Sequence, residues 1–238
     1  MNEEHNLCHN PLCSYTACLA QDRKFDFGLS LFPNYSIGIT SNDGNTPTNV
    51  EEGFQDIETW KPSFSSTIFV EYQLNARSIL GLGMGYQNNG ERTKKLDLQY
   101  GIDPVTGMPI SDPSLPTQIE FIYDHHNIEI PLYYRHLLGS SFFVQIGASG
   151  IVNISNTITS KEYYADGEVK RNTEQDNSTD FRTLNIAGNL GFGMDYLRNE
   201  KISLFVLPYV QYGFFGISEN ASLNRNFLSL GISTGIRI

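Results

Sequence analysis

Cysteine is almost absent from this chain. Its 238 residues include three, Cys8, Cys13 and Cys18, and all of them lie close to the first residue. No disulfide framework can therefore hold the rest of the chain together. The C-x4-C-x4-C spacing, even with His5 and His9 nearby, matches no common zinc pattern. We therefore expect no metal site and no cofactor.

Charge is also scarce, and its balance is acidic. Asp, Glu, Lys and Arg make up 18% of the residues, less than the usual quarter. The 26 acidic side chains outnumber the 16 basic ones, which gives a net charge of −10. Nucleic-acid binding requires clustered Lys and Arg, so we expect no nucleic-acid partner. The acidic cluster around residues 43–58 is typical of a solvated loop, with a divalent-cation site as the alternative.

Long apolar runs are missing as well. The longest stretch without charge, from Leu137 to Ser160, is long enough to cross a bilayer as a helix. It is interrupted repeatedly by Ser, Asn and Gln, and its apolar residues recur at every second position. Because successive side chains of a strand point to opposite faces, this period favours a strand over a helix.

What the chain does contain is alternation. Between Phe142 and Ile154, apolar or small residues alternate with a mostly small and polar set. The same pattern recurs in eight segments in all: 24–40, 62–74, 77–98, 118–138, 141–158, 181–198, 201–217 and 226–238. In four of them the polar face is too rich in Gly, Ser, Asn and charge for an ordinary protein core. The sequence therefore predicts an all-β, eight-stranded, up-and-down antiparallel transmembrane β-barrel with lipid outside and a polar lumen.

The connections between these segments alternate in length. Short turns at 75–76, 139–140 and 199–200 alternate with longer polar segments at 41–61, 99–117, 159–180 and 218–225. Short periplasmic turns and long extracellular loops are typical of outer-membrane barrels. We therefore expect the bacterial outer membrane as the location, its lipid as a partner, and both ends of the barrel on the periplasmic side.

Six charged residues are predicted to point into the lumen. They are Asp26, Glu71, Glu129, Arg135, Asp195 and Arg237. Unpaired charges in a narrow interior are costly, so we expect these side chains to form an ion-pair network. An eight-stranded barrel has room for little more than side chains, and such a network would plug it. A proton or ion pathway is the alternative interpretation of the same residues.

Six tyrosines are predicted to face outward at the two membrane interfaces, where an amphipathic ring is favoured. Those expected near the short turns are Tyr72, Tyr134 and Tyr196, and those expected at the outer interface are Tyr35, Tyr86 and Tyr212. The alternative is that they are ordinary core aromatics of a soluble barrel.

Asp124, His125 and His126 are the residues with most catalytic potential. Outer-membrane hydrolases use Asp and His, but adjacent histidines on a strand face opposite sides. No Ser-centred motif accompanies them. We therefore assign no catalytic residue and expect that the protein is not an enzyme, with a hydrolase as one alternative and a small-solute channel as the other.

Residues 1–20 are expected to be a leader-like or poorly ordered segment, and residues 21–238 the barrel domain. The small residues Cys18 and Ala20 before Gln21 fit a signal-peptidase site. The fit is incomplete, because Glu3 and Glu4 stand where a positive region is usual.

Three segments carry a resemblance to a family. Residues 25–28 (FDFG), 128–135 (IEIPLYYR) and 231–238 (GISTGIRI) are similar to small outer-membrane β-barrel proteins of Bacteroidetes, the PorT-like/OmpA-like group. The resemblance covers about residues 21–238. It implies a structural, surface-interaction or membrane-complex accessory role, with subunits of secretion or uptake complexes as partners of the long extracellular loops. The final residue, Ile238, departs from the aromatic that usually ends the last strand.

Overall fold

In a computed structural model, the described residues are 24–42, 52–53, 56–102, 108, 112, 114–177, 181–199, 202–219 and 223–238. The predicted leader at 1–20 lies outside them. The long strands are β1 (Phe25–Asn42), β3 (Lys61–Asn75), β4 (Ser78–Thr93), β6 (Gln118–Leu138), β7 (Phe142–Tyr163), β9 (Leu184–Arg198), β10 (Ser203–Gly213) and β11 (Leu223–Arg237). Three shorter strands are β2 (Glu58–Thr59), β5 (Leu96–Asp97) and β8 (Val169–Gln175).

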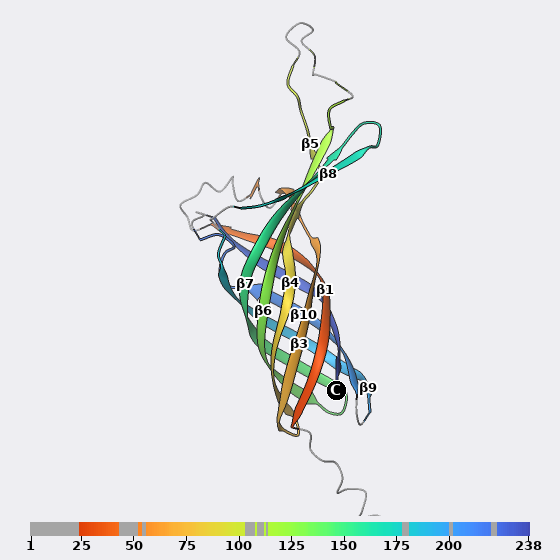
Figure 1. Cartoon of the computed structure of the whole chain (residues 1–238), viewed down its shortest axis with the longest axis vertical. Coiled ribbons are helices and arrows are strands. Elements are labelled where there is room, and N and C mark those ends of the chain that lie inside the picture. The colour runs from red at the N-terminus through yellow and green to blue at the C-terminus, as the bar shows by residue number, and fades with distance from the viewer. Residues whose placement is uncertain are drawn as a thin grey trace, which may run out of the picture.

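The eight long strands close into a barrel. Each pairs antiparallel with its neighbours in the order β4–β3–β1–β11–β10–β9–β7–β6, and β6 pairs with β4 to complete the ring (Figure 1). Every long strand lies beside the next long strand of the chain, and β1 meets β11. The prediction of an all-β, antiparallel barrel is confirmed.

The alternation of side chains also matches the prediction. On β7, Phe142 is 47% exposed, whereas its neighbour Phe143 is fully buried in the lumen. Leu190 and Phe192 of β9 lie on the outer surface, whereas Asn189, which precedes Leu190, is buried. The outside of the barrel is therefore apolar and the inside mostly polar, the reverse of a soluble protein.

Part of the lumen is nevertheless apolar. Phe69, Phe143, Phe205 and Leu207 point inward and form a small buried cluster near the short-turn end. Gly235 makes room for it, because a Cβ at this position would lie 2.6 Å from the Phe205 ring. Inward glycines thus accommodate large rings in a barrel too narrow for large residues on every strand.

Several of the predicted boundaries are wrong, and two of them concern the long-loop end of the barrel. The segment predicted as one strand at 77–98 ends at Thr93, and β5 follows it as a separate short strand. The segment 159–180, predicted as a loop, contains the end of β7 and the whole of β8. Its polar residues pair through their backbones outside the barrel, where no apolar face is needed to form a ladder.

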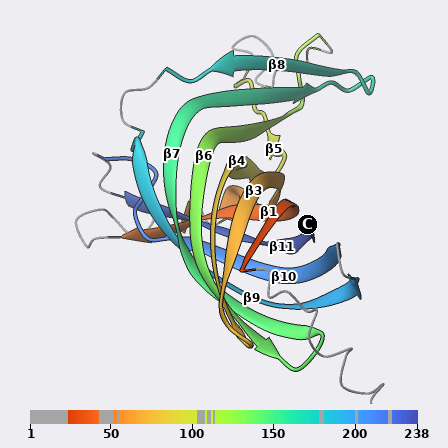
Figure 2. The ribbon, with the colours of Figure 1, turned by 60° about the horizontal axis from the view of Figure 1, so that its bottom comes forward.

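The hairpin of β6 and β7 extends beyond the barrel. These strands have 21 and 22 residues, about twice the 9–11 that cross a bilayer. A register shift between His126 and Asn127 marks a bulge, and Gly90 of the neighbouring strand pairs with Asp124, two residues before the shift. A Cβ at Gly90 would collide with the carbonyl oxygen of Tyr123, so only glycine allows this close approach. We call the sheet beyond this point, formed by β5, β8 and residues 118–124 and 157–163, the extension (Figure 2).

Candidate functional site: the polar lumen and its outer mouth

A charged layer crosses the lumen near the short turns. Arg135 of β6 lies 2.7 Å from Glu71 of β3, and Arg237 of β11 lies 3.2 Å from the other oxygen of the same carboxylate. Arg237 also lies 2.7 Å from Asp195 of β9. Two guanidinium groups meet two carboxylates, so the layer balances its own charge while joining four strands.

Aromatic rings support these arginines. The guanidinium of Arg135 lies 4.4 Å from the centre of the Phe143 ring, and that of Arg237 lies 4.5 Å from the Phe205 ring. Tyr133 donates a 2.8 Å hydrogen bond to the shared carboxylate. Ring faces attract cations most strongly where water is excluded. The layer therefore combines charge pairing with dry aromatic packing and leaves little space for solute.

A second layer crosses the middle of the lumen. Gln87 of β4 donates a 2.5 Å hydrogen bond to Gln211 of β10, on the opposite side of the ring. Gln211 in turn donates a 2.6 Å hydrogen bond to Glu129 of β6. All three side chains are at least 95% buried. This chain of amides and carboxylate closes the lumen a second time.

Small cavities lie on either side of the middle layer. The cavity toward the short turns has a volume of about 60 Å³ and contacts both Glu129 and Arg135. The cavity toward the long loops has a volume of about 40 Å³ and contacts Gln211. One water needs roughly 10–15 Å³ measured in this way, so each cavity holds a few waters. These volumes suit hydration of the polar layers rather than passage of a solute.

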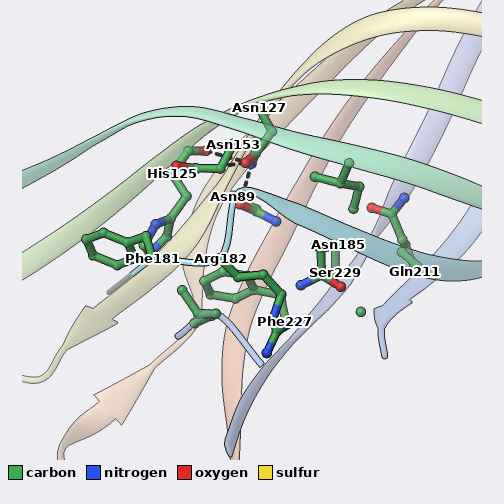
Figure 3. A pocket seen from close by; sticks show the side chains of 14 residues that line it. Asn89, His125, Asn127, Asn153, Phe181, Arg182, Asn185, Gln211, Phe227 and Ser229 are labelled. Atoms are coloured by element: carbon green, nitrogen blue, oxygen red, sulfur yellow. Dashed lines mark hydrogen bonds between the residues drawn. The ribbon is translucent and has the colours of Figure 1, made fainter. Parts of the chain in front are cut away.

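Side chains that line the cavity toward the long loops are shown in Figure 3. His125 projects into this cavity between Phe181 and Phe227, with ring centres 5.3 and 5.1 Å away. Its Nδ1 lies 2.6 Å from the side-chain oxygen of Asn156. Asn89, Asn127, Asn153 and Asn156 continue as a hydrogen-bonded amide cluster.

Charges at the rim form a third layer. Lys61 lies 2.7 Å from Asp124, and Arg225 contacts both Glu58 and Glu91. Among the described residues, these pairs tie β3 to β6, and β11 to β2 and β4. The rim residues were not predicted from the sequence, although Gln87, Asn89 and Glu91 continue the inward alternation of β4.

Glu58 belongs to the rim but lies outside the membrane-spanning strands, because it is part of β2 in the connection between β1 and β3. Burial and the neighbouring Glu91 carboxylate raise the pKa of Glu58 to about 7, against the lowering effect of Arg225. Two carboxylates share a single guanidinium here, so a proton on Glu58 relieves their repulsion.

The structure brings four of the six predicted lumen charges into contact: Glu71, Arg135, Asp195 and Arg237. Glu129 was expected beside the arginines but accepts its hydrogen bond from Gln211. It stands six residues from Arg135 along β6, about 20 Å at the usual rise of a strand. Asp26 lies opposite Glu71 in the β1–β3 register and is half-buried.

The six tyrosines predicted at the membrane interfaces lie on outward-facing positions. Tyr72 and Tyr134 both pair with Leu80 of the strand between them. Tyr196 and Tyr35 are more than half exposed. Tyr86 packs against Phe64, and Tyr212 against Phe214. Their depth in a bilayer remains a prediction.

Asp124, His125 and His126 do not form a catalytic group. Asp124 pairs with Lys61, His125 with Asn156 inside the lumen, and His126 with the Tyr86 hydroxyl at 2.5 Å. The three side chains therefore have separate partners. Within the described ranges, no cluster of His, Cys, Asp and Glu could hold a metal ion. The part of the chain that is described also has no helix of the length and apolarity needed to cross a membrane.

A closed antiparallel barrel with an apolar exterior, a polar lumen, short turns at one end and long connections at the other defines an outer-membrane β-barrel protein. Among solved structures, the chain is similar to Neisserial surface protein A, with a TM-score of 0.42 and 12% identity over 90% of this chain and 96% of that one.

It is also similar to Ail, the attachment invasion locus protein of Yersinia pestis, with a TM-score of 0.39 and 8% identity over 89% and 99% of the two chains. The outer membrane protein OprG from Pseudomonas aeruginosa is similar with a TM-score of 0.27 and 12% identity, over 89% of this chain and 93% of that one. No protein-family model and no curated protein matches the chain. The likenesses assign no function.

Proposed function

We propose that this protein is a non-enzymatic outer-membrane barrel with a closed lumen, which acts through the surface that it presents at its long-loop end. The observation that carries this proposal is the chain of hydrogen bonds from Gln87 through Gln211 to Glu129, across the full width of the barrel. With the charged layer below and the rim pairs above, it leaves cavities for a few waters only.

The extension supplies a surface for such a role. It carries a surface cavity of about 310 Å³ with Phe121 and Ile158 among its apolar residues. The other lining residues are polar or acidic: Ser160, Asn172, Glu174, Gln175 and Asp176. A mixed groove on a projecting sheet suits a polar protein partner better than lipid. We therefore propose a surface-interaction or complex-accessory role, with other outer-membrane, secretion or uptake subunits as the candidate partners.

The catalytic alternative lacks the geometry that a hydrolase needs. A general base must reach the group that it activates, and His125 and His126 are held by Asn156 and Tyr86 instead. A hydrolytic activity of the purified barrel that disappears when both histidines are replaced by Ala would contradict our proposal.

The interaction role is tested by trimming the extension. Residues 160–172 are deleted, and Thr159 is joined to its cross-strand partner Thr173 by an Asn-Gly turn. The control replaces the short turn at Ala76–Arg77 with Asn-Gly. We expect both variants to retain the heat-modifiable mobility of a folded barrel. We expect the trimmed variant alone to lose the proteins that co-purify with the wild type in mild detergent, and an unchanged set of proteins would contradict the role of the extension.

A further inference from the structure

The strand β8 has one free edge. It pairs with β7 along its whole length, and among the described strands none pairs with its other side. All seven of its residues, Val169–Gln175, are exposed. An exposed edge presents unpaired backbone donors and acceptors, which is a template for a further strand.

The backbone groups on this edge can be assigned. The amide of Tyr164 donates to the carbonyl of Glu168, and the amide of Asp176 donates to that of Asn156. In an antiparallel ladder, alternate residues bond the same neighbour. The even-numbered residues of β8 therefore bond β7. The odd-numbered residues, Val169, Arg171, Thr173 and Gln175, direct their N–H and C=O groups to the free edge.

The sequence of β8 is complementary to itself in an antiparallel pair. A two-fold axis at Asn172 pairs all seven residues, with Lys170 of each copy opposite Glu174 of the other. Opposite charges at facing positions stabilise such a pair. An axis at Arg171 would place two arginines face to face, and an axis at Thr173 would leave Val169 and Lys170 outside the paired strands. The charges thus select the axis at Asn172.

The alternation of the backbone groups agrees with this axis. The odd-numbered residues would exchange hydrogen bonds, as Arg171 with Thr173 and Val169 with Gln175. The pairs formed by Asn172 with itself and by Lys170 with Glu174 would be of the non-hydrogen-bonded kind. Side chains approach most closely at such pairs, with Cα atoms about 4.5 Å apart. The charged pairs would therefore lie at the closer positions.

The edge of β8 also faces outward from the extension. Figure 2 shows β7 and β8 side by side, with β8 on the outside of the pair, in a view turned toward the axis of the barrel. Figure 1, seen from the side of the barrel, shows the same strands close together beyond the mouth. The local axis of an antiparallel pair is normal to its sheet. For two copies in one membrane to meet edge to edge with their short turns on the same side, this axis must run broadly along the barrel.

We propose that the free edge of β8 is a homodimerisation site, which joins a second copy of this chain through a continuous β-sheet with its two-fold axis at Asn172. In one copy, Lys170 lies over the ring of Tyr164 and Glu174 accepts a hydrogen bond from Asn172. Both charged groups are on the surface and free to turn toward a second copy. Such an interface is isologous and closed, so it ends at the dimer rather than a fibre.

The test is register-specific crosslinking in bacterial membranes. Cys8, Cys13 and Cys18 are first replaced by Ser, and single cysteines are introduced as Asn172→Cys, Lys170→Cys and Thr173→Cys. After oxidation with copper phenanthroline, we expect a disulfide-linked dimer for Asn172→Cys. The two copies of residue 170 would be about 14 Å apart along the strands, too far for a disulfide. Lys170→Cys therefore serves as the matched negative control.

Charge reversal provides the second measurement. Lys170→Glu is expected to weaken the dimer roughly tenfold, and Lys170→Glu with Glu174→Lys is expected to restore it. A monomeric Asn172→Cys variant, stronger crosslinking at 170 or 173, or no rescue by the double reversal would each overturn the proposal. The inference rests on the barrel lying in a membrane, as proposed above. Heat-modifiable mobility tests that premise separately, so a folded barrel without crosslinks refutes the dimer alone.

Discussion

The carboxylate of Glu71 is the centre of the charged layer in the lumen. It contacts Arg135 and Arg237 and accepts the hydrogen bond from Tyr133, and it is 1% exposed. Removing one member of a buried ion pair leaves the other charge desolvated and without compensation. Its substitution should therefore cost far more than that of an exposed acid.

We expect Glu71→Ala to lower the free energy of unfolding by about 3–5 kcal/mol. The measurement is urea-induced unfolding in lipid vesicles, followed by tryptophan fluorescence and gel mobility. Glu168→Ala, at an exposed position of the extension, is the matched control and should change stability by less than about 0.5 kcal/mol. Equal effects of the two substitutions would show that the charged layer does not hold the barrel together.

Glu58 gives the rim a dependence on pH. Its pKa in the folded protein is about 7, raised by burial and by Glu91 from the ordinary 4.5. The folded state therefore holds this proton more tightly than the unfolded state does. The contribution of Glu58 to stability is fully present below about pH 4.5 and is lost as the pH rises through 7.

We predict that the wild type becomes less stable from pH 5 to pH 8, and that Glu58→Gln removes part of this slope, because an amide keeps the uncharged form at every pH. Unfolding midpoints of the two proteins at matched ionic strength provide the measurement. If the two slopes coincide, the carboxyl of Glu58 titrates normally.

Individual lumen residues were predictable to the extent that alternation determines their direction. Four residues point inward as expected: Glu71, Arg135, Asp195 and Arg237. Each belongs to the set of alternate residues that faces the lumen on its strand. Which of them pair depends on the stagger between strands, which no single sequence contains. Glu129 illustrates this, because it faces the same lumen as Arg135 but lies at another height.

Strands that cross the membrane were predictable because lipid imposes a strict period of two. The ends of β4 and β7 were not, since the extension lies in water on both faces and no apolar pattern marks it. Its polar strand β8 resembles a loop in composition. Backbone pairing with β7 rather than side-chain burial determines its structure.

The outer face of β9 carries a prediction at this level. Leu190 is half exposed, pairs with Ile146 and Val210 of the neighbouring strands, and lies six residues before Tyr196 on β9. We place this position near the midplane and therefore expect Leu190→Arg to cost about 2–4 kcal/mol in a bilayer. Leu74→Arg, at the short-turn end of β3, is the control and should cost about 0–1 kcal/mol. Equal costs in vesicle unfolding assays would contradict the assigned depth of Leu190.

Three layers of interacting side chains cross the lumen of the barrel. The charged layer, the amide chain at Gln211 and the rim pairs connect strands on different sides of the lumen. Sequence patterns could predict the strands of the barrel and which face of each strand is apolar. They could not predict the amide layer, since Gln87 and Gln211 are remote in sequence and meet only when the barrel closes.

Electrical conductance tests this closed barrel most directly. The purified, refolded protein is inserted into planar bilayers, and insertion is verified independently by protease protection of the barrel. We predict no stable unitary current, because the cavities on either side of Gln211 hold only a few waters and do not join into a pore. Large and stable unitary steps from the inserted wild type would contradict the account.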